Sequence, residues 1–254
     1  MQSNLHLPTK RIFFFNKKHI FLSVFISIIL TSFCQAKEVI YLFPGQGSDY
    51  RIFNEISFDT SLFNVMVIEY DIPEKSMTMK EYAKELSIQV DTSGEYILIG
   101  VSLGGMICVE LSEYINPSKT IIISSAKNRQ ELPFRFKFQR IIPLYKVFPG
   151  SILLLGAKVL QPIVEPDRNK NKQIFKSMLA SKNPTYMKRT IGMVITWDRV
   201  ENSKMIYHIH GTNDHTIPFR NITDPDYVIE NGSHMMTLTR AEEISRILKE
   251  IIEH

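Results

Sequence analysis

The stretch Gly100-Val101-Ser102-Leu103-Gly104, followed by Gly105, decides the fold. It comes directly after the apolar run 96–101 and opens a helical pattern of apolar residues. A serine on a sharp strand-to-helix turn requires small residues two positions before and after it, because larger side chains would collide. Glycine at both positions meets that requirement. The pattern predicts a nucleophile elbow carrying Ser102, and a glycine-rich packing turn is the alternative.

Short apolar runs elsewhere predict the strands of a parallel sheet. They are rich in Ile, Val and Tyr, end at turn residues, and show little polar alternation, which is typical of strands covered on both faces. The expected strands are 39–43, 65–70, 96–101, 120–124, 205–209 and 227–229. Amphipathic helices separate them. This alternation predicts an α/β fold with a mostly parallel central sheet of about six strands flanked by helices.

Two of the helices carry a start signal. Thr78 with Glu81 predicts a capping box, in which each side chain bonds the backbone of the other residue. Thr239 with Glu242 predicts the same arrangement at the start of the last helix.

Residues 127–202 interrupt the alternation of strands and helices. They show helical patterns and no convincing strand, and six prolines end the helices among them. We predict a helical lid here, inserted before the strand 205–209, within one domain that spans 37–254. A peripheral helical layer with no role in binding is the alternative.

A serine nucleophile needs a base that is oriented by an acid, and the chain order Ser…Asp…His places both in loops after later strands. Asp214 follows the strand 205–209, and His234 lies between the last strand and the last helix. We therefore predict Ser102, Asp214 and His234 as the catalytic residues.

Three other histidines lie close to these positions. His215 is adjacent to the predicted acid and is the rival base, whereas His208 and His210 lie on the strand or its exit and are expected to be structural.

Two backbone amides are expected to bind the oxyanion that forms during acyl transfer. One belongs to Leu103, the residue after the nucleophile. The other is expected in the loop Phe43-Pro44-Gly45-Gln46-Gly47-Ser48, whose glycines permit a tight turn. Gln46 is the first choice and Gly45 the second, and a simple β-turn without this role is the alternative.

Together, the glycine-rich loop, the elbow and the acid and base loops resemble the α/β-hydrolase superfamily over 37–254. The segments 44–53 and 231–236 resemble a branch of small bacterial members. One departure concerns the oxyanion loop, which opens with Pro44-Gly45 where many esterases have His-Gly.

The resemblance implies a serine hydrolase that cleaves small-molecule esters or thioesters through an acyl-enzyme, without a metal or organic cofactor. In that mechanism His234 takes the proton of Ser102 and Asp214 stabilises the imidazolium. An acyltransferase similar to the malonyl-CoA enzymes is one alternative, although the interval between Gly45 and Ser102 is short for it. A binding protein on a hydrolase scaffold is the other.

Composition and charge exclude several classes. With 44% hydrophobic and 22% charged residues, 254 residues are neither disordered nor fibrous, and two cysteines exclude a disulfide scaffold or a multi-cysteine metal site. The net charge of +4 comes from four cations within residues 1–36, and basic and acidic residues balance in the remainder. A neutral body argues against nucleic acid as a partner.

Residues 1–36 are predicted to be an export signal. Their cations precede an uncharged run at 20–33, which is shorter than the roughly 20 residues that cross a bilayer, and small residues follow at Cys34 and Ala36. Cleavage after Ala36 would release a periplasmic or secreted protein. An uncleaved anchor, with membrane contact through residues 12–33, and lipidation at Cys34 are the alternatives.

Overall fold

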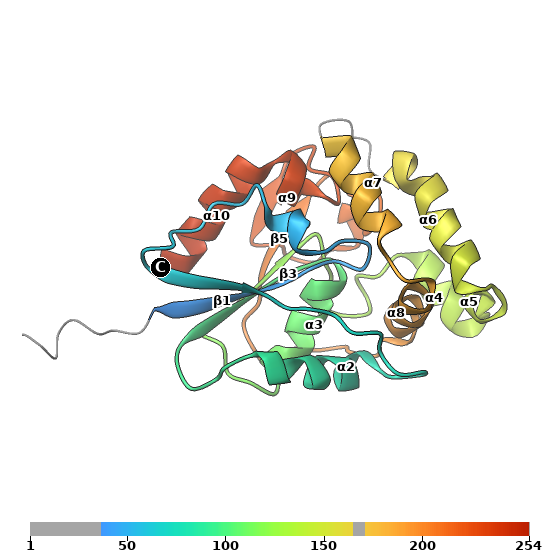
Figure 1. The fold of residues 1–254 in the computed structure, drawn as a ribbon, viewed down its shortest axis with the longest axis horizontal. Coiled ribbons are helices and arrows are strands. Elements are labelled where there is room, and N and C mark those ends of the chain that lie inside the picture. The colour runs from blue at the N-terminus through green and yellow to red at the C-terminus, as the bar shows by residue number, and fades with distance from the viewer. Residues whose placement is uncertain (1–36, 165–170, 254) are drawn as a thin grey trace, which may run out of the picture. The chain divides into compact units, whose positions relative to one another are not determined.

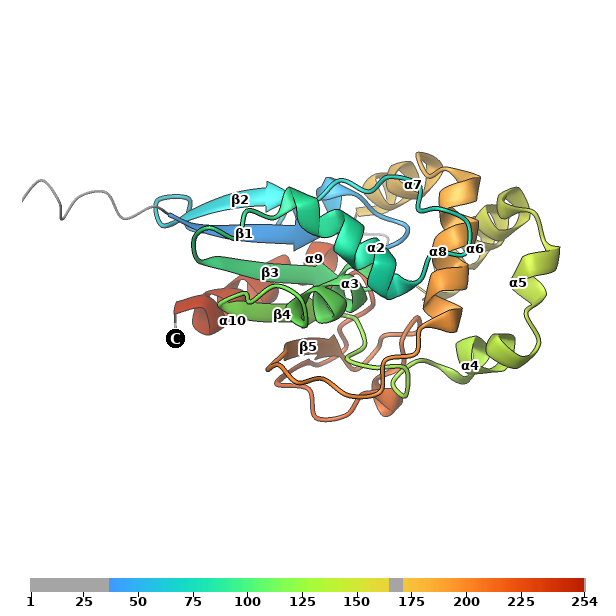
Figure 2. The ribbon, with the colours of Figure 1, turned by 90° about the horizontal axis from the view of Figure 1, so that it is seen from below.

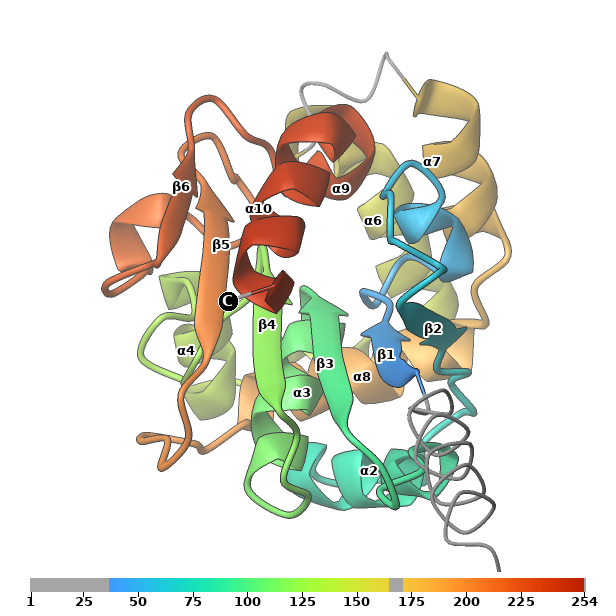
Figure 3. The same ribbon diagram turned by 90° about the vertical axis from the view of Figure 1, so that its left-hand side faces the viewer.

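Six strands form a single parallel sheet among the residues that the computed structural model describes, which are 37–253 without 165–170. The order is β2-β1-β3-β4-β5-β6, and every neighbouring pair runs parallel (Figure 3). The strands are β1 (Glu38–Phe43), β2 (Phe63–Val67), β3 (Tyr96–Val101), β4 (Lys119–Ile123), β5 (Tyr207–Gly211) and β6 (Tyr227–Ile229). The predicted fold class is confirmed.

Helices cover both faces of this sheet (Figure 1). Those that follow β2 and β3 pack on one face, and those that follow β6 pack on the other. The helices are α2 (Met79–Leu86), α3 (Leu103–Ser112), α4 (Phe134–Ile141), α5 (Leu144–Val147), α6 (Gly150–Val164), α7 (Lys172–Ala180), α8 (Pro184–Thr196), α9 (Met236–Thr239) and α10 (Ala241–Glu253). Short 3-10 turns add η1 (Tyr50–Phe53), η2 (Ser87–Gln89) and η4 (Phe219–Asn221).

The central strands are buried because side chains alternate between two apolar layers. Tyr41 and Phe43 of β1 pack with α2 and α3, whereas Ile40 and Leu42 pack with α9 and α10. Every residue of β3 is buried. This double coverage explains the unbroken apolar runs in the sequence.

Two strands differ in extent from the prediction. β2 is an edge strand that pairs only with β1, and its pairing ends opposite Leu42, so it stops at Val67 rather than at 70. β5 starts at Tyr207 rather than at 205 and continues to Gly211, because its pairing with β6 reaches that residue.

One predicted helix cap is present and the other is absent. The Thr78 backbone N–H donates to the Glu81 carboxylate (2.9 Å), and the Glu81 N–H donates to the Thr78 hydroxyl (3.2 Å). The prediction for Thr239 was wrong. The chain makes a helical turn over α9, so Thr239 ends that helix with a buried hydroxyl that has no partner in the described part of the chain, and α10 begins at Ala241.

The helices α4 to α8 lie between β4 and β5 in the sequence and beyond the carboxyl ends of the strands in space (Figure 2). α8 packs against α4, α5 and α6. No strand occurs in the described part of 127–202, hereafter the helical insertion. Its position is the one expected for a lid, and its role as a lid remains a prediction.

The elbow is held by close contact between α3 and the sheet. A side chain on Gly104 would overlap the Phe43 carbonyl of β1, and one on Gly100 would overlap the backbone of Gly104. α3 is buried along its whole length as a result. Tyr114 lies beyond the end of this helix and is exposed.

We predict that Gly104→Ala lowers the free energy of unfolding by more than about 1–3 kcal/mol, the usual range for overpacking, because its Cβ meets backbone that cannot yield. Gly156→Ala on α6 is the matched control, because a Cβ at this position meets no atom within 4 Å. Alanine stabilises a helix relative to glycine by roughly 0.5–1 kcal/mol, so this variant should not lose stability. Urea unfolding of both variants measures the difference. Equal stability of the two would contradict the packing described for the elbow.

Candidate active site

Ser102 occupies a strained turn between β3 and α3. Its backbone has φ 53° and ψ −117°, a conformation that side-chain-bearing residues rarely adopt. The Ser102 N–H donates to the Ile123 carbonyl (3.0 Å), and the Ser125 hydroxyl donates to the Ser102 carbonyl (2.7 Å). Both backbone groups are thus fixed by β4 and the residues after it, and the side chain stays half-buried at the carboxyl end of the sheet.

The structure brings Ser102, His234 and Asp214 into one hydrogen-bonded chain. His234 Nδ1 lies 2.7 Å from Asp214 Oδ2, and His234 Nε2 lies 2.9 Å from Ser102 Oγ. Because an ionised carboxylate only accepts, Nδ1 carries the proton and Nε2 is left to accept from the serine hydroxyl. This is the arrangement a general base requires.

Asp214 is held rigidly for its contact with His234. Its Oδ1 accepts from the backbone N–H groups of Thr216 and Ile217, each at 2.8 Å, which leaves Oδ2 facing the imidazole. Asp214 as a whole is only 3% exposed. A charge buried to this extent needs several donors, and the loop after β5 supplies them.

A pair of buried histidines lies behind the acid. His210 Nε2 is 2.9 Å from the Ile217 carbonyl and 3.5 Å from Asp214 Oδ2, and His210 Nδ1 is 3.1 Å from His208 Nε2. Burial lowers the pKa of both rings, and that of His208 falls well below its usual value. Both rings are therefore neutral near pH 7 and support the acid loop.

His215, the rival base, points elsewhere. Its ring is exposed and bonds the Asn213 side chain (Nε2···Oδ1 2.8 Å). The geometry thus favours His234 over His215 as the partner of the serine.

The loop 44–48 lies against the serine. A Cβ on Gly45 would be 3.3 Å from the Ser102 Cβ. The Ser48 N–H donates to the Gly45 carbonyl (3.1 Å), so the loop is a β-turn, and its position beside the serine leaves the oxyanion role open to it. The Tyr70 hydroxyl fixes the loop from outside by donating to the Pro44 carbonyl (3.0 Å).

The amides of Leu103 and Gln46 make no hydrogen bond within the described part of the chain. Leu103 begins α3, where a helix leaves its first N–H groups without intrahelical acceptors. Both amides are thus available as hydrogen-bond donors, and their role as oxyanion donors stays a prediction.

The side chain of Gln46 connects this loop to the helical insertion. Its Nε2 donates to Thr190 Oγ1 on α8 (2.7 Å), and the Thr190 hydroxyl in turn donates to the Tyr186 carbonyl (2.8 Å). Thr190 is fully buried. The sequence carried no sign of this contact, because the two residues are far apart in the chain.

A pocket of about 180 Å³ opens at Ser102 and His234. The helical insertion supplies its apolar wall, through Ala157 of α6, Phe175 and Leu179 of α7, and Met187 of α8. Sequence reasoning did not identify these four residues, since an apolar position on a helix gives no sign of which face meets a pocket. No group of three or more potential metal ligands occurs in the described part of the chain.

No family model matches the chain, and no curated protein matches it in sequence. Solved structures share its fold at low sequence identity. An enol-lactonase from Burkholderia xenovorans superposes with a TM-score of 0.67 at 12% identity, over 87% of this chain and 93% of that one. An esterase from Thermogutta terrifontis gives 0.65 at 16% identity, over 86% and 90%.

A third similar structure, a lipase-esterase related protein from Clostridium acetobutylicum, gives a TM-score of 0.62 at 16% identity, over 84% of this chain and 93% of that one. The similarity spans almost the whole described unit in each case. Sheet order, elbow and superposition agree that this chain has the fold of the α/β-hydrolase superfamily.

Proposed function

We propose that this protein is a serine hydrolase that cleaves carboxylic esters through an acyl-enzyme. The observation that carries the proposal is the chain from Ser102 through His234 to Asp214, with contacts of 2.9 and 2.7 Å. Structures with the same fold include an esterase and an enol-lactonase, which act on open or cyclic esters as their names state. Their names support the reaction class.

In the proposed mechanism, the first half of the reaction forms the acyl-enzyme. His234 Nε2 takes the proton as Ser102 Oγ attacks the ester carbonyl, and Asp214 stabilises the imidazolium that results. The amides of Leu103 and Gln46 bind the oxyanion of the tetrahedral intermediate, where one lost donor typically costs about 100- to 1000-fold in rate. His234 then gives its proton to the leaving alcohol, and the acyl group stays on Ser102.

Water completes the cycle by the same route in reverse. His234 takes a proton from water, the resulting hydroxide attacks the acyl carbonyl, and Ser102 leaves with the proton from His234. None of these steps requires a cofactor.

The pocket argues for a small acyl group. Its volume of about 180 Å³ lies below the roughly 300–1,000 Å³ of typical small-molecule sites. Its wall from the helical insertion is apolar, so a short hydrocarbon chain fits better than a charged one. We therefore propose short-chain esters as substrates, with the insertion acting as the lid over them.

The proposed function includes export, on the basis of residues 1–36, which lie outside the described residues. In the described part of the chain, no helix is long and apolar enough to cross a membrane.

Protein recovered from an export-competent host should begin at Lys37, because cleavage is expected after Ala36. N-terminal sequencing of the periplasmic or secreted fraction measures this. A chain that begins at Met1 in the membrane fraction would replace cleavage with anchorage.

Ser102→Ala and His234→Ala should each lower kcat/KM for a short-chain nitrophenyl ester by at least about a thousandfold, since members of a catalytic triad act as a unit. His215→Ala is the matched control and should retain activity, because its ring bonds Asn213 rather than the serine. Stopped assays on folded, purified variants give the comparison. Activity in Ser102→Ala, or its loss only in His215→Ala, would overturn the assignment.

Acyl-chain preference should depend on the inner face of the insertion. Activity should rise with chain length by roughly fourfold per methylene, the equivalent of about 0.8 kcal/mol, until the pocket is full. Leu179→Ala, at the pocket wall, should shift the optimum toward longer esters. Leu155→Ala should leave it unchanged, because that side chain is 60% exposed.

The ratio of rates on successive esters measures this shift without depending on how much protein is folded. Leu154 is buried against Leu179 and Met187, behind the pocket wall, so Leu154→Ala should have an intermediate effect. An unchanged profile in both Leu179→Ala and Leu154→Ala would show that the insertion is a packing layer and not a lid.

A further inference from the structure

The outer side of the helical insertion carries an apolar surface that nothing in the described unit covers. On α6, Ile152, Leu155 and Val159 recur at helical spacing and are 50%, 60% and 64% exposed. The opposite face of the same helix, with Leu154 and Ala157, packs inward. A helix that is apolar on both faces is normally buried on both.

Exposed apolar side chains also occur on α4 and α5. Phe134, Phe138 and Ile141 form one stripe of α4, and Phe134 and Ile141 are 77% and 81% exposed. α4 has no buried residue. Leu144, Val147 and Phe148 extend the exposed apolar surface at α5. Exposed apolar area on this scale marks an interaction site in a folded protein.

The charges of this segment have one sign. Residues 132–164 contain five cations and no acid, and none of the five forms an ion pair in the described part of the chain. They are Arg135, Lys137, Arg140, Lys146 and Lys158. Apolar side chains interleaved with unpaired cations are typical of surfaces that lie in the interface of an anionic bilayer.

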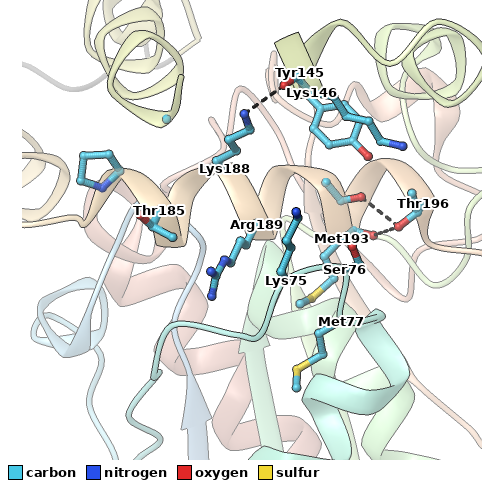
Figure 4. A pocket seen from close by; sticks show the side chains of 13 residues that line it. Lys75, Ser76, Met77, Tyr145, Lys146, Thr185, Lys188, Arg189, Met193 and Thr196 are labelled. Atoms are coloured by element: carbon cyan, nitrogen blue, oxygen red, sulfur yellow. Dashed lines mark hydrogen bonds between the residues drawn. The ribbon is translucent and has the colours of Figure 1, made fainter. Parts of the chain in front are cut away.

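A cleft of about 680 Å³ lies between α5 and α8, and Ser102 does not line it (Figure 4). Tyr145 and Lys146 of α5 form part of its wall, and Lys75, Lys188 and Arg189 add three more cations. No carboxylate lines it. Met77, Met193 and Pro184 supply apolar contacts between the cations.

Two contacts hold the cations in place around the cleft. Lys188 Nζ donates to the Lys146 carbonyl (3.0 Å), and the Arg189 guanidinium donates to the Pro73 carbonyl (2.6 Å). Among the described residues, neither charge has a counter-ion. The phosphate group of a phospholipid carries the negative charge that would balance these cations. The acyl chains of the same lipid match the apolar helices beside the cleft.

We propose that α4, α5 and α6 form a surface that docks on bilayers of anionic phospholipid, with the cleft between α5 and α8 receiving lipid headgroups. This surface is separate from residues 12–33, through which the sequence analysis allowed membrane contact. It places the inner face of the insertion over the candidate active site and the outer face against lipid.

A fluorophore at Leu155 tests the docking in the full chain. Leu155→Cys is labelled with an environment-sensitive dye in a Cys34→Ser background, where the remaining Cys108 is buried and unreactive toward it. Vesicles of phosphatidylcholine and phosphatidylglycerol should shift the emission to the blue, and vesicles of phosphatidylcholine alone should not. Ile88→Cys, 85% exposed on η2, is the matched control and should show no shift.

Charge-reversal variants test whether the cleft binds lipid headgroups. Lys146→Glu and Lys188→Glu should each raise the lipid concentration at half-maximal shift by at least about fivefold, the effect of roughly 1 kcal/mol per cation near an anionic surface. Lys84→Glu, at an exposed position of α2, is the control and should leave the midpoint unchanged.

Four results would overturn the proposal: no shift at Leu155, an equal shift at Ile88, equal response to neutral and anionic vesicles, or charge variants that behave as the control does. A shift that grows with protein concentration without vesicles would assign the surface to a second copy of the chain instead. Binding of glycerol phosphate without any shift at Leu155 would reduce the cleft to a site for small anions.

Discussion

The close approach of Gly104 to the carbonyl of Phe43 is the contact on which the site depends. It seats the start of α3 directly against β1, immediately after the turn at Ser102, where φ is 53°. The loop after β1 lies beside the serine, where a Cβ on Gly45 would be 3.3 Å from the Ser102 Cβ. The side chains of His234 and Asp214 then need only loops of the correct length at the ends of β5 and β6.

The parallel sheet explains why three residues far apart in the chain meet. Parallel strands present all their carboxyl ends at one edge, and Ser102, Asp214 and His234 each follow a strand at that edge. The helical insertion leaves the sheet at this edge, after β4, and the chain then returns to the amino end of β5, which runs parallel to β4. The candidate active site therefore lies between the strand ends and the helices α6, α7 and α8 (Figure 2).

The helical insertion has two faces with different surroundings. Its inner face contributes the wall of the small pocket and, through Thr190, a hydrogen bond to Gln46 in the predicted oxyanion loop. Its outer face is apolar and basic. A movement of α8 would therefore act directly, through this hydrogen bond, on the loop that is proposed to bind the oxyanion.

Much of this architecture could be predicted from the sequence because it depends on local signals. Strand ends and glycine spacing indicated the elbow, and chain order indicated Asp214 and His234, which the structure brings to Ser102. The pocket wall could not be predicted, because which side of α7 or α8 faces the serine depends on how several helices pack together. The cap predicted at Thr239 was wrong for a related reason. The spacing of Thr239 and Glu242 suits a capping box, but Thr239 is the last residue of the helical turn α9, and its hydroxyl is buried there.

Reaction with a fluorophosphonate tests the central claim most directly, because it reports whether His234 and Asp214 make Ser102 nucleophilic without knowledge of the substrate. The folded protein should be labelled on the peptide that contains Ser102, and His234→Ala should react more slowly by roughly a thousandfold. Folded protein that remains unlabelled would favour a binding protein on a hydrolase scaffold. Labelling of another serine, or an unchanged rate in His234→Ala, would contradict the proposed mechanism.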